Sequence, residues 1–373
     1  MPLELKRVST AQERLEFIRM ARSVYPAESP WVPPLLSERQ KFLDPQVNPF
    51  FKNAEVEFYL AREGAGTPVG RIALIHDRRF NEFHAENTGL FGFFESVDDE
   101  AVAAILFRRA MQWAEEKGFD RVLGPFNFST NHECGILVDG FDRPPTVGMT
   151  YNPPYYPSLI EGSGFRKAKD LLSFKLHAKV VPEYLDRAAQ RISRRNRFRV
   201  RNLRIGKFDE ELKILWDIYN AAWEKNWGFV PLVWEEFHFC AHELRHIVNP
   251  EFCLIAEIDS EPCGFCLGIP DINPALKSMN GKMFPLGWLR FLLGKRNIDV
   301  YRVSILGTKR NFRKMGIEGI FYHEVYKSLI KNQISRCEMS WILEDNRDII
   351  IPIQRLGGSI YKRHRIYERD CGH

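Results

Sequence analysis

Apolar and polar residues recur along the chain with two different spacings. In residues 53–75 and 249–269 the apolar positions alternate or run together on both sides of a short polar turn, which predicts two strands joined as a hairpin in each segment. In residues 10–25 and 209–223 the apolar positions are three and four residues apart, the spacing of an amphipathic helix. The pattern therefore predicts helices mixed with antiparallel strands.

The order of these elements is the same in both halves of the chain. Each half begins with an amphipathic helix, continues with a second helical stretch after a Val-Pro pair, and then has the hairpin, a further strand and a long helix. We therefore predict an α/β (α+β) protein in which one unit, a mixed and mostly antiparallel sheet flanked by helices, occurs twice, at 1–190 and 191–373. The matching pairs are Val32-Pro33 with Val230-Pro231 and Glu57-Phe58 with Glu251-Phe252.

Composition agrees with a globular protein of this size. The chain has 373 residues, of which 45% are hydrophobic and 27% charged, enough for two ordinary domains. Its seven cysteines show no disulfide framework spacing, and residues 1–17 lack the apolar core of a secretory signal, so we expect a reduced, cytoplasmic location. Cys263 and Cys266 lie in an expected strand and are interpreted as buried core residues.

Two segments suggest partners of the protein. Residues 283–294 are apolar between basic residues, which is typical either of a stretch lying in a membrane interface or of a buried helix; peripheral contact with the inner face of the membrane through 282–296 is the expectation that stays open. Residues 191–207 are densely basic and end in an alternating, strand-like pattern. No base-stacking module accompanies them, so a solvated face or a patch for acidic lipid or a phosphorylated cofactor is favoured over nucleic acid.

Residues 240–246, CAHELRH, contain His242, Glu243 and His246 in the H-E-x-x-H order of zinc peptidases. That motif requires a helix, because positions i and i+4 must share a face to hold one ion. The charged Arg245 stands between the histidines, and no third ligand follows at a typical spacing. We therefore predict no metal cofactor, with adventitious binding on the face of His238, His242 and His246 left open.

A possible anion site follows the strand expected at 301–307. Residues 313–319, RKMGIEG, open a helix, and the unpaired backbone N–H groups of a helix start attract a diphosphate. Here the sequence resembles the GNAT superfamily of acyl-CoA N-acyltransferases, although Glu318 stands where that family has Gly or Ala. The resemblance implies an acyl-CoA site formed by Leu306, Gly307, Thr308, Arg313, Lys314, Met315, Gly316, Ile317, Glu318, Gly319 and Asn346.

Longer stretches extend the resemblance over nearly the whole chain. WVPPLLSE, NPFF, GPFNFSTNHECGILVDGF and YNPPYY are similar to a bacterial family of tandem GNAT-like proteins that includes proteins linked to bacterial ceramide synthesis. The resemblance implies transfer of an acyl group, including a long fatty acyl group, from acyl-CoA to an amine such as a sphingoid base. The first unit has no phosphate loop before its long helix, so we expect it to lack the cofactor. The tyrosine that often protonates the departing thiolate in GNAT enzymes would fall at Ile353.

Amide formation from a thioester needs a base that keeps the amine neutral. Glu344, at the end of an expected strand beside the proposed cofactor, is the candidate base, and His323 is the weaker choice; a capping or ion-pair role for Glu344 stays open. Polar residues of the first half either line a substrate cleft or hold their own loop by hydrogen bonds. The predicted substrate-binding residues are Asn127, Asn131, Glu133, Tyr151, Asn152, Trp223 and Trp227.

Two other functions stay open from the sequence. One is an aminoacyl or peptide-type transferase that uses aminoacyl-tRNA, for which the basic residues 191–207 offer a surface. The other is a non-catalytic ligand-binding protein, which the departures at Glu318 and Ile353 favour.

Overall fold

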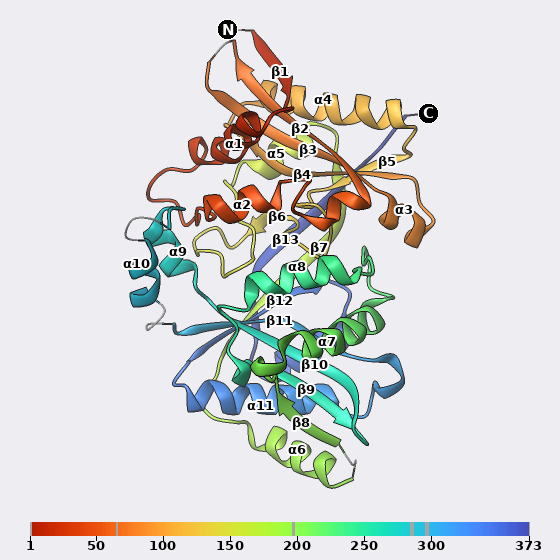
Figure 1. Cartoon of the computed structure of the whole chain (residues 1–373), viewed down its shortest axis with the longest axis vertical. Coiled ribbons are helices and arrows are strands. Elements are labelled where there is room, and N and C mark those ends of the chain that lie inside the picture. The colour runs from red at the N-terminus through yellow and green to blue at the C-terminus, as the bar shows by residue number, and fades with distance from the viewer. Residues whose placement is uncertain (1, 65, 196–197, 284–286, 295–297, 373) are drawn as a thin grey trace. The chain divides into compact units, whose positions relative to one another are not determined.

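A computed structural model describes residues 2–64, 66–195, 198–283, 287–294 and 298–372 (Figure 1). The chain forms two compact units, and neither is continuous in sequence. Unit 1 consists of Met1–Leu171, Asn273–Leu293 and Lys362–His373, and unit 2 of Leu172–Ile272 and Gly294–Tyr361. The internal repeat with its boundary after residue 190 stays a prediction, because it concerns similarity between segments rather than their packing.

Unit 1 contains a mostly antiparallel sheet in which β4 and β5 pair in parallel. Its strands follow the order β1-β2-β3-β4-β5-β13, and β6 also pairs with β13. The following strand, β7, continues from unit 1 into unit 2. Their bounds are β1 Leu3–Arg7, β2 Ala54–Glu63, β3 Pro68–Asp77, β4 Thr88–Ser96, β5 Arg121–Gly124, β6 Ile136–Asp139, β7 Arg166–His177 and β13 Ser359–Asp370.

Helices cover both faces of this sheet. Phe58 of β2 packs against Phe17 of α1, while Tyr59 joins the core under α4, and successive side chains of a strand point to opposite faces. The first helix begins with a capping box of Thr10 and Glu13. The helices are α1 Ala11–Met20, η1 Ala21–Ser23, α2 Leu36–Phe42, η2 Pro49–Lys52, α3 Arg78–His84, α4 Glu100–Lys117, α5 Tyr156–Gly162, α9 Asn273–Met279 and α10 Gly287–Gly294.

Unit 2 has the strand order β7-β12-β11-β10-β9-β8, with β11 and β12 parallel and β8 to β11 antiparallel. The strands are β8 Phe198–Asn202, β9 Cys253–Ile258, β10 Glu261–Pro270, β11 Val300–Thr308 and β12 Arg336–Leu343. The helices are α6 Glu183–Arg195, η3 Ile205–Lys207, α7 Phe208–Trp223, α8 Trp234–Leu244, η4 Pro250–Phe252, η6 Arg310–Phe312, α11 Ile317–Lys331 and α12 Arg347–Arg355.

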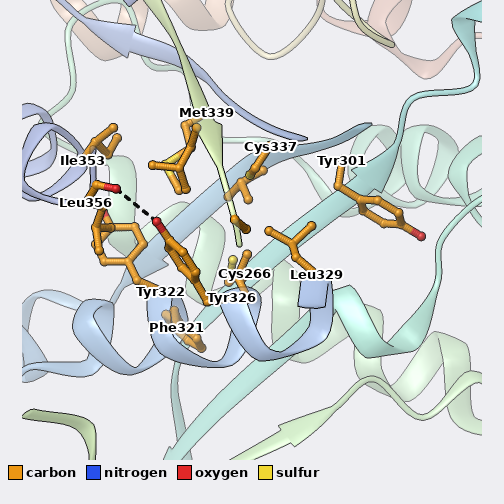
Figure 2. Packing of buried hydrophobic residues seen from close by; sticks show 14 of the residues in the cluster. Cys266, Tyr301, Phe321, Tyr322, Tyr326, Leu329, Cys337, Met339, Ile353 and Leu356 are labelled. Atoms are coloured by element: carbon orange, nitrogen blue, oxygen red, sulfur yellow. Dashed lines mark hydrogen bonds between the residues drawn. The ribbon is translucent and has the colours of Figure 1, made fainter. Parts of the chain in front are cut away.

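The core of unit 2 lies between α11 and one face of its sheet. Figure 2 shows Tyr326 of α11 donating a hydrogen bond of 3.1 Å to the Leu356 carbonyl at the end of α12. Cys266 of β10 belongs to this core, whereas its neighbour Phe265 packs against Trp223 of α7. The alternation along β10 therefore places α7 and α11 on opposite faces.

The structure confirms the α/β class with mostly antiparallel sheets flanked by helices. All seven cysteines are free thiols, and the strand expected at Cys263 and Cys266 is β10, in which both are buried. Within the segment 282–296, residues 284–286, 295 and 296 lie outside the described residues, so contact of this segment with a membrane stays a prediction. None of the helices that the structure describes has the length and apolar character that crossing a bilayer requires.

Candidate active site

The strands β11 and β12 separate at their carboxyl ends. Their parallel pairing runs from Val300 opposite Arg336 to Val303 opposite Met339, and β11 then continues to Thr308. The register between β11 and β10 shifts at the same point, because Ser304 is the extra residue of a β-bulge in β11. Residues 304–306 are only half-buried although β11 is an interior strand. The separated part of β11 can therefore present backbone N–H groups to a ligand.

The helix that follows this strand begins with free backbone donors. Gly316, with φ of 85°, is the N-cap of α11, and no side chain among the described residues caps the helix there. A Cβ atom on Gly319, in the first turn, would meet none of the described atoms within 4 Å. The start of α11 thus combines uncapped N–H groups with open space, and the residues present fit an anionic ligand such as a diphosphate.

The loop between β11 and α11 is fastened to the end of α7. Arg313 donates hydrogen bonds to the Ala222 carbonyl and, at 3.4 Å, to the Thr308 carbonyl. Lys309 forms an ion pair of 2.7 Å with Asp217. The Arg313 guanidinium therefore anchors this loop to the carboxyl end of α7, where a positive charge is favourable. The other predicted loop residues, Lys314, Met315, Ile317 and Glu318, lie in this loop or in the first turn of α11.

An aromatic side chain covers β11 from the α7 side. A Cβ atom on Gly307 would lie 2.1 Å from Cη2 of Trp223, so only glycine allows this close approach. The Trp223 ring also lies 5.0 Å from that of Tyr219 and 6.0 Å from that of Phe265, centre to centre. The structure thus brings Trp223 together with the predicted cofactor strand, at Gly307 beside Leu306 and Thr308, while Trp227 is half-buried in the loop after α7.

The two candidate bases lie in different surroundings. Glu344 directly follows β12 and is half-buried, and Asn346 is the N-cap residue of α12 two positions later. His323 is a buried residue of α11, with Nε2 2.9 Å from Asp186 of α6 and Nδ1 3.0 Å from Glu324. His323 therefore links α11 to α6, whereas Glu344 lies at the carboxyl edge of the separating strands.

A buried polar network that was not predicted from the sequence lies on these strands. Arg302 of β11 donates to Ser340 Oγ at 3.0 Å, Ser340 donates to Glu338 Oε1 at 2.6 Å, and Tyr361 donates to Glu338 Oε2. Burial and the Glu338 charge raise the pKa of Tyr361. The signal in the sequence was one charged residue inside each apolar strand, at Arg302 and Glu338.

In unit 1 the polar residues beside β4 form hydrogen bonds with the backbone and with one another. The Phe93 N–H of β4 donates to Asn127 Oδ1 at 2.8 Å, and Asn127 Nδ2 donates to Glu133 Oε2 at 2.9 Å. Arg39 binds both Glu133 oxygens, at 3.0 and 3.2 Å. Burial raises the pKa of Glu133, but the charge of Arg39 outweighs it and holds the pKa below its usual value. Asn127 and Glu133 therefore have the partners that a scaffold role requires, and a substrate role for them stays a prediction.

The other predicted substrate residues of unit 1 also make internal hydrogen bonds. The Asn152 side chain accepts from the Leu137 N–H at 2.6 Å and donates to the Leu137 carbonyl at 3.1 Å. Tyr151 donates to the Phe141 carbonyl at 3.2 Å, and the backbone N–H of Asn131 donates to Ser129 Oγ at 3.2 Å. These residues belong to unit 1, whereas Trp223 and Trp227 belong to unit 2.

The helix after β4 begins with a side-chain cap, unlike the helix after β11. Asp99 caps α4 by accepting from the Ala101 N–H at 2.7 Å, whereas each of the two helices has one acidic residue in its first turn, Glu100 in α4 and Glu318 in α11. Every residue of β4 is buried, and Phe93 packs against Phe128 with ring centres 5.1 Å apart. The Asp99 carboxylate at the helix start and the buried packing of β4 both disfavour a diphosphate. The expectation that unit 1 lacks the cofactor stays a prediction.

The H-E-x-x-H motif does not lie within one helix. Helix α8 ends at Leu244, so His242 and Glu243 are helical whereas His246 lies beyond its end. His246 therefore follows the last helical turn, whereas the peptidase motif places both histidines inside one helix.

Two curated proteins are similar to the chain over nearly its whole length. It is 33% identical over 365 residues to "Protein YghO" of Escherichia coli (strain K12), and the aligned region covers 95% of this chain and 92% of that protein. It is also 33% identical over 370 residues to the "Bacterial ceramide synthase" of Caulobacter vibrioides (strain NA1000 / CB15N), covering 97% of this chain and 96% of that protein. No family model matches the chain.

Solved structures share the fold at low sequence identity. A tandem GNAT protein from the clavulanic acid biosynthesis pathway superposes with a TM-score of 0.55 and 12% identity, covering 100% of this chain and 99% of that one. A GCN5-related N-acetyltransferase from Sphaerobacter thermophilus gives a TM-score of 0.52 and 12% identity, with coverages of 100% and 96%. Both likenesses extend over both units.

Proposed function

The chain belongs to the bacterial family of tandem GNAT-like proteins that includes the bacterial ceramide synthase of Caulobacter vibrioides, and from this premise we propose that it is an acyl-CoA-dependent N-acyltransferase. Its proposed substrates are a long-chain acyl-CoA and an amine-bearing lipid of the sphingoid-base type, which together form an N-acyl amide.

One observation carries the proposal. In unit 2 the strands β11 and β12 separate directly before the uncapped start of α11, and residues 304–306 remain half-buried there. A diphosphate is favoured at the start of α11, and backbone N–H groups of the separated strand can stabilise negative charge on the thioester oxygen. Both features lie in the same unit and support an acyl-CoA substrate.

The residues of unit 2 are suited to the chemistry of amide formation. The amine nitrogen attacks the thioester carbonyl carbon, and Glu344 accepts the proton that this nitrogen loses. A C–N bond forms, the C–S bond breaks, and CoA leaves as a thiolate that takes up a proton. Glu344 is proposed for this role because β11 and β12 are parallel, so that the residue after β12 lies at the same edge of the sheet as the residues before α11.

Aromatic residues on α7 and after it support an apolar substrate. The Tyr219 ring lies 5.0 Å from Trp223, 5.7 Å from Phe229 and 6.0 Å from Phe237. This cluster reaches Gly307 through Trp223. Phe229 and Phe237 are buried, whereas Tyr219 and Trp223 are half-buried, and these two rings beside β11 support an acyl or sphingoid chain over a polar amine.

Product formation tests the proposal directly. The purified protein is incubated with palmitoyl-CoA and sphinganine, and the expected result is N-palmitoyl sphinganine, detected by mass spectrometry only when both substrates are present. Binding of palmitoyl-CoA without any product from a cell lipid extract would support the non-catalytic alternative. Product from aminoacyl-tRNA alone would support the aminoacyl transferase.

Two variants assign the base. Glu344→Gln is expected to lower kcat by about 10²–10⁴-fold, the usual contribution of a general base, with KM for acyl-CoA nearly unchanged. His323→Gln, the matched control, is expected to keep kcat within about threefold and to lower the free energy of unfolding, because it removes the link between α11 and Asp186. The reverse result, with kcat lost only in the His323 variant, would make His323 the base.

A further inference from the structure

A group of three potential metal ligands joins two helices of unit 2. Asp209 lies in the first turn of α7, and His238 and His242 lie one turn apart on α8. The Asp209 Oδ1 atom is 3.3 Å from His238 Nε2 and 3.2 Å from His242 Nε2. Among the described residues, this is the one group of three such side chains whose ligand atoms all lie within 4.8 Å of one another.

The two distances from Asp209 are compatible with a tetrahedral ion. Zinc binds imidazole nitrogen and carboxylate oxygen at roughly 2.0–2.2 Å, so neighbouring ligand atoms on a tetrahedron are about 3.3 Å apart. The Nε2–Oδ1 distances of 3.3 and 3.2 Å are close to this value, and the two imidazole nitrogens lie within 4.8 Å of each other. The side chains of His238, His242 and Asp209 are 38%, 36% and 68% exposed, so small rotations can bring the two imidazoles to the same ion.

We propose that Asp209, His238 and His242 bind one Zn²⁺ ion, with water in the fourth position. Two imidazole nitrogens and one carboxylate oxygen are the ligand types that zinc favours, whereas Mg²⁺ and Ca²⁺ require oxygen ligands. This site differs from the H-E-x-x-H motif, because it uses His238, which is helical, instead of His246, which lies beyond the end of α8.

The ion has a structural consequence that is independent of acyl transfer. It connects the start of α7 to the middle of α8, and the same two helices also meet where the rings of Trp216 and Trp234 lie 6.0 Å apart. A ligand that binds only the folded protein stabilises it, so zinc is expected to raise the melting temperature.

Calorimetry of the full chain tests the site. The protein is purified without a histidine tag, treated with a chelator and titrated with ZnCl₂ and MgCl₂. We expect one Zn²⁺ per chain and no measurable Mg²⁺ binding. His238→Ala, His242→Ala and Asp209→Asn are each expected to weaken zinc binding at least about tenfold. All three side chains are partly exposed, and circular dichroism checks that the variants fold.

His246→Ala is the matched control, because it removes the other histidine of the motif. We expect it to leave zinc affinity unchanged. Equal loss in His246→Ala and His242→Ala would overturn the proposal in favour of the H-E-x-x-H pair. Unchanged affinity in His238→Ala would overturn it as well. Cobalt replaces zinc in a spectroscopic check: the spectrum is expected to lack a thiolate charge-transfer band, and the presence of that band would place the ion on Cys240 or another cysteine instead.

Discussion

Gly316 and Gly319 lie about one turn apart at the start of α11, and only the first has a backbone conformation that requires glycine. Gly316 has a positive φ of 85°, and a Cβ there would lie 2.5 Å from Ile192 Cδ1. Gly319 is helical, and a Cβ on it would be in open space with respect to the described atoms. The first position therefore needs glycine, and the second does not.

Alanine at these two positions is expected to change stability in opposite directions. Gly316→Ala should lower the free energy of unfolding by about 1–2 kcal/mol, because an L-residue is strained in the left-handed region. Gly319→Ala should raise it by about 0.5–1 kcal/mol, because alanine favours the helix. Urea unfolding measures both. Equal effects of the two substitutions would show that Gly316 is not held at positive φ.

The buried His132 predicts a dependence of stability on pH. Its ring packs 5.3 Å from Phe42 and 6.0 Å from Phe50, and its Nδ1 lies 3.0 Å from Ser129 Oγ. Burial lowers the pKa of His132 to about 4. In the unfolded chain the pKa is about 6.5. Between these values the unfolded state binds more protons than the folded state, so the free energy of unfolding falls as the pH falls.

His132→Gln isolates this contribution. From about pH 7 to about pH 5 the natural protein should lose about 2 kcal/mol more stability than the variant, because glutamine does not titrate. Other buried acids such as Glu95 affect both proteins equally, so the difference between the two curves is the relevant quantity. Parallel curves in urea unfolding at the two pH values would mean that His132 is accessible to protons in the folded state.

Most individual elements could be predicted from the sequence, because each follows from local periodicity. Helix α1 lies within the segment predicted at 10–25, and α7 and the hairpins β2-β3 and β9-β10 extend no more than two residues beyond the segments predicted at 209–223, 53–75 and 249–269. The long helices expected after the two hairpins are α4 and α11. Helix α6 was not expected, since the basic residues near its end resemble a strand or a loop. The polar residues of the candidate site were recognised, but their partners were not, because Asn127 and Phe93 meet only after the chain folds.

The hydrogen bonds of Asn127 lead to a prediction about β4. Asn127→Ala leaves the Phe93 N–H without its acceptor and should lower the free energy of unfolding by about 1–3 kcal/mol. If the side chain serves only as scaffold, kcat/KM of the folded variant stays within about twofold. A raised KM at unchanged stability would instead place Asn127 in the substrate site. Asn332→Ala, which removes an exposed hydrogen bond to Glu251, is the control and should cost less than about 0.5 kcal/mol.

At the scale of the whole molecule, the two units share one topology and differ at the start of the helix that joins their parallel strands. Each has a pair of parallel strands joined through a long helix, β4-α4-β5 in unit 1 and β11-α11-β12 in unit 2. In unit 1 the strand is fully buried and the helix is capped by Asp99, whereas in unit 2 the strand is partly open and the helix starts at Gly316. The sequence indicated a difference only through the phosphate loop, which is present before α11 and missing before α4. It did not predict that residues 273–293 and 362–373 pack with unit 1, because such contacts depend on the complete fold.

This asymmetry predicts one CoA per chain. Free CoA lacks the fatty acyl group that makes acyl-CoA form micelles, so it suits calorimetry. The titration should give a stoichiometry of one CoA per protein chain. Gly316→Val should weaken binding at least about tenfold by displacing the backbone donors at the start of α11. Asp99→Ala, the matched change at the start of α4, should cost about 1 kcal/mol of stability through the lost cap and leave CoA affinity unchanged. Two sites per chain would contradict the prediction, and so would a single site that responds to the change at Asp99 but not to the change at Gly316. Either result would mean that unit 1 binds CoA and that the buried residues around β4 move apart on binding.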